Sequence, residues 1–325
     1  MDPEIQRIWD LFTPLYPSPD KEQDALREAR FLAHYTSIDV LEKIAATDEI
    51  WFSNPLFMND LEEVKFGILQ GGEMLRASKR LLNSLNSDKR CSVFVDSLNR
   101  YVAQFDQDHL FDTYVFCLSR HDENNTDGRL SMWRGYGGNG RGAAIIFDTS
   151  KIVLQADTPL ILSRVFYGSA DKRLAWVREL GDKIAAIVVG NSIPDDKVYL
   201  IASAAFERLK LFALFTKHSG FAEEDEWRIV YMPERDSGGL FKPMLHYMNG
   251  PRGVEPKLKL KVAPLEGVIP SGVTLDNIVA KILLGPTTSS VLAQRSVGRM
   301  LEVVGKPTWK ERLSVSNIPL RGGQF

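Results

Sequence analysis

The stretch FLAHYTSIDVLEKIAATDEIWFSNP occupies residues 31–55 and predicts a strand, a helix and a second strand. Residues 31–35 are mostly apolar or aromatic, which favours a short strand. Thr36 and Asp39 then match the hydroxyl-x-x-acid start of a helix, in which the hydroxyl caps exposed backbone amides. His34 therefore lies where a strand gives way to a helix, and such junctions commonly face a pocket.

The remainder of the chain alternates between helical and strand patterns. We expect helices in residues 5–12, 21–30, 60–110, 130–136, 172–187, 197–217 and 289–304. We expect further strands at residues 50–53, 114–119, 143–147, 226–232, 258–263 and 279–284. No repeat or linker divides the chain, so we expect residues 1–30 as a helical extension. Residues 31–325 are then a single α+β domain, with helical insertions near 60–110 and 172–217.

Charge balance limits the function classes. The chain has 325 residues, with 40 Lys and Arg against 42 Asp and Glu, and a net charge of -2. This balance argues against a dedicated binder of nucleic acid or acidic membranes, although a local basic groove is not excluded. Lys79, Arg80, Lys89 and Arg90 are candidates for such a groove, but a solvated helix face explains them better.

Cysteine content and hydropathy indicate the compartment. The two cysteines, Cys91 and Cys117, are too few for a disulfide scaffold and are expected as reduced thiols. The first residues show no secretory pattern. Apolar runs such as Ile184–Val189 fall far short of the roughly 20 residues that span a bilayer. We therefore expect a soluble cytoplasmic protein with no membrane partner.

Two common ligand motifs are disfavoured by their context. Gly135, Gly137 and Gly140 match Gly-x-Gly-x-x-Gly, but a predicted helix precedes them and a predicted strand follows. A dinucleotide site needs the reverse order, so these glycines predict a turn. The five histidines show no i, i+4 pair and there is no Cys-x-x-Cys motif, so we expect no metal site.

The sharpest local feature is the acidic run Glu223-Glu224-Asp225-Glu226, which leads directly into Trp227-Arg228. In an extended chain alternate side chains share a face, so Glu224, Glu226 and Arg228 are expected to point one way. Paired carboxylates are tolerated where an arginine or a cationic ligand lies nearby. Taken alone, a solvated acidic turn before a strand is the simpler interpretation.

Two further groups remain ambiguous from the residues alone. His34, with Tyr35 and Thr36, is either a hydrogen-bonded structural residue or part of a site. Trp133 and Tyr136 either stack on a flat ligand or fill the core.

The motifs are more informative as an ordered set. The set consists of residues 32–37, 50–55 with Asn59-Asp60, 131–136, 140–148, 224–228 and 282–286. This order resembles the bacterial family known as domain of unknown function 2971 (DUF2971), over about residues 31–290. The family name implies no activity.

A looser resemblance supplies chemistry. An early histidine, a middle aromatic or serine and a later glutamate are similar to the ADP-ribosyltransferases. This resemblance implies two small, mostly antiparallel sheets that form a cleft for NAD, without a metal. It also implies a toxin or phage-defence effector. A fixed carboxylate would stabilise the oxocarbenium-like cation that forms when the nicotinamide–ribose bond breaks.

The same resemblance implies roles for individual residues. Glu226 would be the ribose-binding catalytic carboxylate and Glu224 would activate the acceptor, a protein or a nucleic acid. Tyr136 or Trp133 would stack on nicotinamide, and Arg228 would hold a phosphate or orient Glu226. NAD binding would also use the early residues His34, Tyr35, Thr36 and Ser53. Two alternatives stay open, namely a non-catalytic module that binds a nucleotide or a partner, and a nucleic-acid-directed effector.

Overall fold

A computed structural model describes residues 2–16, 19–58, 61–152, 158–250 and 253–320. The chain forms two compact units, each built from three segments. The helical unit contains Met1–Ser18, Asn54–Thr113 and Val165–Ala222, and the sheet unit contains Pro19–Ser53, Tyr114–Arg164 and Glu223–Phe325. The helical insertions expected near 60–110 and 172–217 fall within the helical unit, whereas the expected N-terminal extension contributes to both units.

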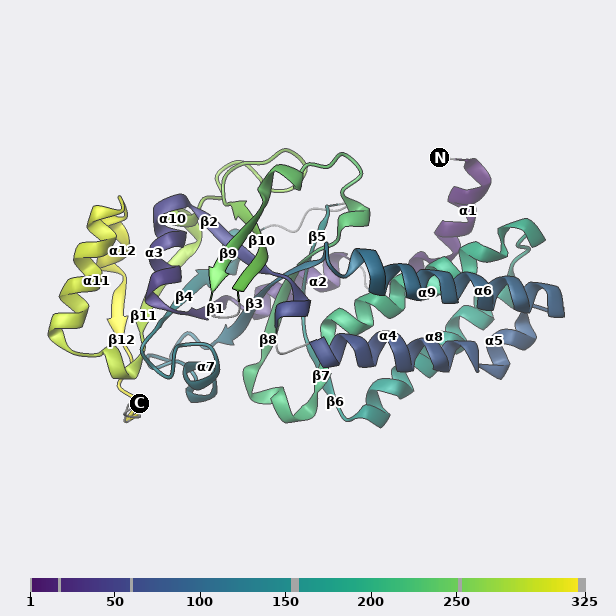
Figure 1. Ribbon diagram of the computed structural model, residues 1–325, viewed down its shortest axis with the longest axis horizontal. Coiled ribbons are helices and arrows are strands. Elements are labelled where there is room, and N and C mark those ends of the chain that lie inside the picture. Colours follow the sequence, from purple (N-terminus) through teal and green to yellow (C-terminus); the bar gives the residue numbers. More distant parts are fainter. Residues whose placement is uncertain (1, 17–18, 59–60, 153–157, 251–252, 321–325) are drawn as a thin grey trace. The chain divides into compact units, whose positions relative to one another are not determined.

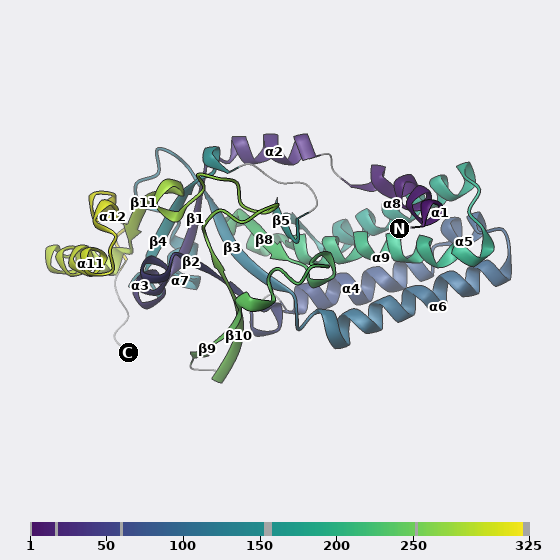
Figure 2. The same ribbon diagram turned by 90° about the horizontal axis from the view of Figure 1, so that it is seen from above.

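Long helices dominate the helical unit. Helices α4, α6, α8 and α9 run beside one another (Figures 1 and 2). The most apolar of them, α9, is buried along most of its length. Gly67 of α4 allows close packing there, because a Cβ atom would lie 2.6 Å from the Ala213 backbone. The elements of this unit are α1 (Pro3–Phe12), α4 (Leu61–Arg76), α5 (Lys79–Ser84), α6 (Asp88–Gln104), α8 (Ala170–Gly190), α9 (Val198–Phe215) and the parallel pair β6 (Phe166–Gly168) and β7 (Thr216–His218).

The sheet unit contains one ten-stranded sheet. Its main path runs β12-β11-β4-β1-β3-β2-β10-β9, and β8 pairs with β3 and with β5. All pairings are antiparallel except that of β11 with β12. The strands are β1 (Phe31–Thr36), β2 (Glu49–Ser53), β3 (Tyr114–His121), β4 (Ala143–Asp148), β5 (Leu160–Arg164), β8 (Glu226–Tyr231), β9 (Leu245–Gly250), β10 (Gly253–Lys261), β11 (Val279–Leu284) and β12 (Leu313–Val315).

The sheet divides at β3. Strand β8 pairs with β3 from Tyr114 to Ser119, so β1 and β2 must share the opposite edge. Strand β2 meets that edge at Val115, and β1 meets it from Ser119 to His121. The α+β class is therefore confirmed, but the expectation of two separate small sheets is wrong. Strand β3 has eight residues, so one of its edges can pair with β8 while the other pairs with both β1 and β2. These pairings join the ten strands into one sheet.

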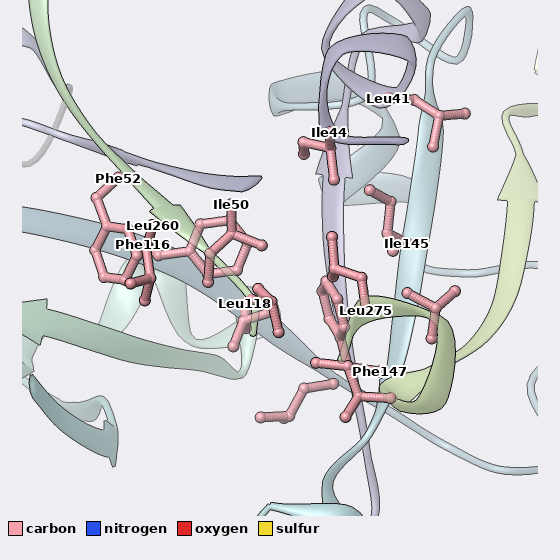
Figure 3. Close-up of a cluster of buried hydrophobic side chains, with 14 of the residues drawn as sticks. Leu41, Ile44, Ile50, Phe52, Phe116, Leu118, Ile145, Phe147, Leu260 and Leu275 are labelled. Carbon is pink, nitrogen blue, oxygen red and sulfur yellow. The ribbon is translucent and has the colours of Figure 1, made fainter. Parts of the chain in front are cut away.

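The hydrophobic core of the sheet unit lies on one face of this sheet (Figure 3). Phe116 and Leu118 of β3 contribute to it together with Trp227 of β8. Helix α3 (Ile38–Thr47) adds Leu41 and Ile44, the apolar face expected from the sequence. A smaller cluster around Trp133 lies on the other face of β1 and β4.

The start of α3 differs from the sequence expectation in one residue. Ser37, and not Thr36, is the N-cap, and its hydroxyl accepts a hydrogen bond from the Val40 amide at 3.2 Å. Thr36 cannot cap because it is still paired in β1, opposite Ala143. The remaining helices are α2 (Pro19–Glu28), α7 (Leu130–Gly135), α10 (Leu275–Ile278), α11 (Val291–Val303) and α12 (Pro307–Glu311). Among the helices of the described ranges, none is both long and apolar enough to cross a bilayer.

Candidate functional site

The acidic turn, Glu223–Glu226, leads into β8. Asp225 has a φ of 44°, an uncommon conformation for a residue other than glycine. Two hydrogen bonds from β3 hold the turn, from the Ser119 hydroxyl to the Glu224 carbonyl at 2.6 Å and from the Arg120 amide to the Asp225 carbonyl at 2.9 Å. Such strained residues persist where the surroundings fix them, and they cluster at ligand sites.

Glu226 forms a bidentate ion pair with Arg228. The guanidinium donates from Nε to Oε1 at 2.8 Å and from Nη2 to Oε2 at 3.0 Å. Both residues are almost fully buried, at 4% and 1% exposure. They share a face because they are two apart in β8, opposite Ser119 and Cys117 of β3. The pair holds the Glu226 carboxylate in one orientation, and the role expected for Arg228 in a site stays a prediction.

Glu224 has a different environment. The strand begins only at Glu226 and Asp225 is left-handed, so the expected alternation does not extend back to Glu224. Its carboxylate is half-buried and accepts a hydrogen bond from the Tyr136 hydroxyl at 3.1 Å. Tyr136 follows the last residue of α7 and is 38% exposed. An exposed aromatic ring and an accessible carboxylate are thus joined.

Arg129 is a residue of this site that the sequence analysis missed. Its guanidinium donates to the Asp225 carboxylate at 2.8 Å, to the Glu223 carbonyl at 3.1 Å and to the Arg120 carbonyl at 3.2 Å. Its amide donates to the Tyr35 hydroxyl at 2.9 Å. Arg129 ends an irregular polar loop, where no periodic pattern marks a residue as important.

Trp133 and Tyr35 belong to the core. Their rings meet edge to face, with centroids 4.8 Å apart. The Trp133 indole is fully buried and donates to the Asp127 carbonyl at 2.8 Å, so it has no free face for a ligand. Burial raises the pKa of Tyr35, and the Arg129 amide opposes that shift. Of the two aromatic candidates for stacking, only Tyr136 is accessible.

His34 is not brought together with the acidic turn. Its ring stacks on Phe116 at 4.4 Å, on the core face of the sheet, whereas Glu226 lies on the opposite face. Burial lowers the pKa of His34 to about 4, and a hydrogen bond with the Cys117 carbonyl opposes the shift. Since a carbonyl only accepts, the neutral imidazole carries its proton on Nδ1, which lies 2.9 Å from that oxygen.

Thr36 and Ser53 also lie apart from the acidic turn. Thr36 is buried at the end of β1, beyond the residues that pair with β3. Ser53 pairs with Val115, at the opposite end of β3 from Ser119. Its hydroxyl accepts a hydrogen bond from Lys257 at 3.0 Å. The other early candidate, Tyr35, is linked to the turn through Arg129, whose amide donates to the Tyr35 hydroxyl.

The glycines form the turn expected between α7 and β4. The Gly142 amide donates to the Gly137 carbonyl at 2.9 Å, and Gly138 and Gly140 have positive φ values. Over the described ranges, no group of three or more His, Cys, Asp or Glu residues is placed to hold a metal ion. Asn59-Asp60, part of the ordered motif set, lies outside the described residues.

Comparison with known families supports the resemblance drawn from the motifs. Residues 132–229 match the family described as "Protein of unknown function (DUF2971)". The matched stretch includes Tyr136, the acidic turn and Arg228. No curated protein and no solved structure matches the chain.

Proposed function

We propose that the acidic turn and Tyr136 form the nicotinamide–ribose end of an NAD site, and that the protein is an NAD-dependent ADP-ribosyltransferase or NAD glycohydrolase. The observation that carries this proposal is the hydrogen bond of 3.1 Å from the Tyr136 hydroxyl to Glu224. It places a carboxylate beside an exposed aromatic ring. A cationic, flat nicotinamide favours an aromatic face, and a developing ribosyl cation favours a carboxylate.

The proposal gives each group a defined step. The bond between nicotinamide and C1′ of the ribose breaks, and its electron pair leaves with neutral nicotinamide. Glu224 stabilises the oxocarbenium-like ribose more than the uncharged ground-state sugar, which lowers the barrier. Water or an acceptor nucleophile then forms the new bond to C1′ and releases its proton to solvent. Related glycosyl chemistry uses carboxylates in the same way.

The proposal moves the catalytic role from Glu226, where the sequence expectation placed it, to Glu224. Glu226 is enclosed by Arg228, so we assign it to positioning the strained turn. Glu224 is half-buried and becomes the proposed catalytic carboxylate. His34 has no part in this end of the site, because its side chain lies on the other face of the sheet.

The test is release of nicotinamide from NAD, followed by chromatography. Wild-type protein should release nicotinamide, and Glu224→Gln should reduce the rate by about a hundredfold, the order of loss seen when one fixed group that stabilises transition-state charge is removed. Glu223→Gln is the matched control, because the Glu223 side chain is exposed and it is the backbone carbonyl of Glu223 that Arg129 holds in the turn. Equal activity of wild type and Glu224→Gln would refute the assignment.

One observation favours a second candidate, a non-catalytic module that binds a nucleotide. The ADP-ribosyltransferase pattern implies two glutamates that act on the substrates. Here Glu226 is buried in an ion pair with Arg228, which leaves Glu224 as the proposed acting carboxylate of the two. A thermal shift on adding NAD, without nicotinamide release under any acceptor condition, would support this candidate over the enzyme.

A further inference from the structure

The segment Ser316–Leu320 follows β12 and has no regular secondary structure. The Ser316 amide donates to the Leu284 carbonyl of β11 at 2.9 Å, which continues the pairing of β12 with β11. Beyond that point the chain leaves the sheet edge and runs over the loop before α7. We call residues 316–320 the strap.

The strap is bonded to Asp127, two residues before Arg129. The Ser316 hydroxyl donates to the Asp127 carbonyl at 2.7 Å, and the Asn317 amide donates to the Asp127 carboxylate at 2.6 Å. The same Asp127 carbonyl accepts the indole N–H of Trp133 at 2.8 Å. One carbonyl thus links the strap to the central residue of α7.

Apolar contacts extend this link to the glycine turn. Ile318 packs against the buried cluster that contains Trp133 and Tyr35. Leu320 lies so close to Gly140 that a Cβ atom there would be 2.8 Å from the leucine side chain. The strap therefore contacts the segment on both sides of α7, the helix that precedes Tyr136.

We propose that the strap is a positioning device that orders residues 127–142 and thereby sets the Tyr136–Glu224 and Arg129–Asp225 contacts. Ser316 is buried, but beyond it only the half-buried side chains of Ile318 and Leu320 and the Asn317 amide hold the described part of the strap, and Asn317 and Pro319 are exposed. Segments with so few buried contacts open at low free-energy cost. Docking and release of the strap is thus a local means of regulating the site. That this regulation acts on the binding or cleavage of NAD rests on the proposed function.

The test is amide hydrogen exchange of residues 127–142 in the full chain. The double variant Ser316→Ala/Ile318→Asp removes one hydrogen bond and places a charge in the apolar contact. We expect exchange in this segment to accelerate by about tenfold or more. The matched control is Leu292→Asp, which introduces the same charge at an exposed leucine of α11, and it should leave the segment unchanged.

Two results would overturn the strap proposal. One is unchanged exchange of residues 127–142 in the double variant, and the other is equal acceleration in Leu292→Asp. Hydrogen exchange is measured without NAD, so its result does not depend on the proposed function. The nicotinamide-release assay tests that function separately. Wild-type protein that neither binds nor cleaves NAD, together with accelerated exchange in the double variant, would refute the NAD site and support the strap.

Discussion

Replacement of Arg228 by methionine tests whether the buried ion pair holds the acidic turn. The change removes the hydrogen bonds of 2.8 and 3.0 Å to Glu226 and keeps a side chain of similar length. Both side chains are almost fully buried. Loss of one partner of a buried pair typically costs about 3–5 kcal/mol, because the remaining charge is left poorly compensated. We expect a loss of about 3 kcal/mol.

Hydrogen exchange of the β3 and β8 amides measures this loss within the sheet unit. A cost of about 3 kcal/mol corresponds to exchange that is faster by roughly a hundredfold. The variants Glu226→Gln and Glu226→Gln/Arg228→Met complete a double-mutant cycle. The two residues are in contact, so we expect a coupling of at least about 1 kcal/mol. Additive costs, or exchange within about threefold of wild type in Arg228→Met, would refute the reasoning.

Three further predictions concern the sheet unit. The pKa of His34 is lowered from 6.5 to about 4, so the unfolded chain takes up this proton first as the pH falls. The free energy of unfolding should therefore fall by on the order of 3 kcal/mol as the pH is lowered from 6.5 to 4. In His34→Phe, the free energy of unfolding should change less over this pH range. Gly142→Ala places a Cβ atom 2.0 Å from the Thr36 carbonyl, whereas Gly135 has nothing within 4 Å. Thermal denaturation should therefore show a loss of about 3 kcal/mol for Gly142→Ala and little change for Gly135→Ala, and equal losses would contradict the packing argument. Lys306 is buried and pairs with Asp48 at 2.5 Å and Asp276 at 3.1 Å. In the same assay, Lys306→Met should lower the free energy of unfolding by about 2 kcal/mol, and the more exposed Lys310→Met by less than about 0.5 kcal/mol. A larger loss in Lys310→Met than in Lys306→Met would contradict this prediction.

Local patterns in the sequence were sufficient to predict most regular elements of the fold. The strand–helix–strand unit of residues 31–53 is present as β1, α3 and β2. Strand β8 was predicted because Trp227, Ile229 and Tyr231 alternate with residues of the other face. Strands β5 and β9 were not predicted, because their side chains are only partly buried and show little alternation. The pairing of β3 with β1, β2 and β8 joins segments that are distant in sequence, and no local pattern reveals it.

The sequence identified part of the candidate site but not its geometry. The sequence identified the acidic run and Tyr136, and these are in contact. It placed Glu224 in line with Glu226, but the left-handed Asp225 interrupts the alternation. Sequence order also suggested that His34 converges with the glutamates, although strand register puts it on the other face.

Arg129 and the strap show a further limit of local patterns. Their contacts join segments that are distant in sequence, such as Ser316 with Asp127. Neither segment has a periodic apolar pattern that would indicate a structural role. The strap meets the loop before α7 only when the chain is folded, through contacts such as that of Asn317 with Asp127.

The most direct test of the central claim is saturation-transfer difference NMR of NAD with the wild-type protein and with Tyr136→Leu. If Tyr136 and Glu224 form the nicotinamide end of the site, the nicotinamide protons should show strong enhancements in wild type that disappear in Tyr136→Leu. No enhancement in wild type, or nicotinamide enhancements that are unchanged in the variant, would contradict the account.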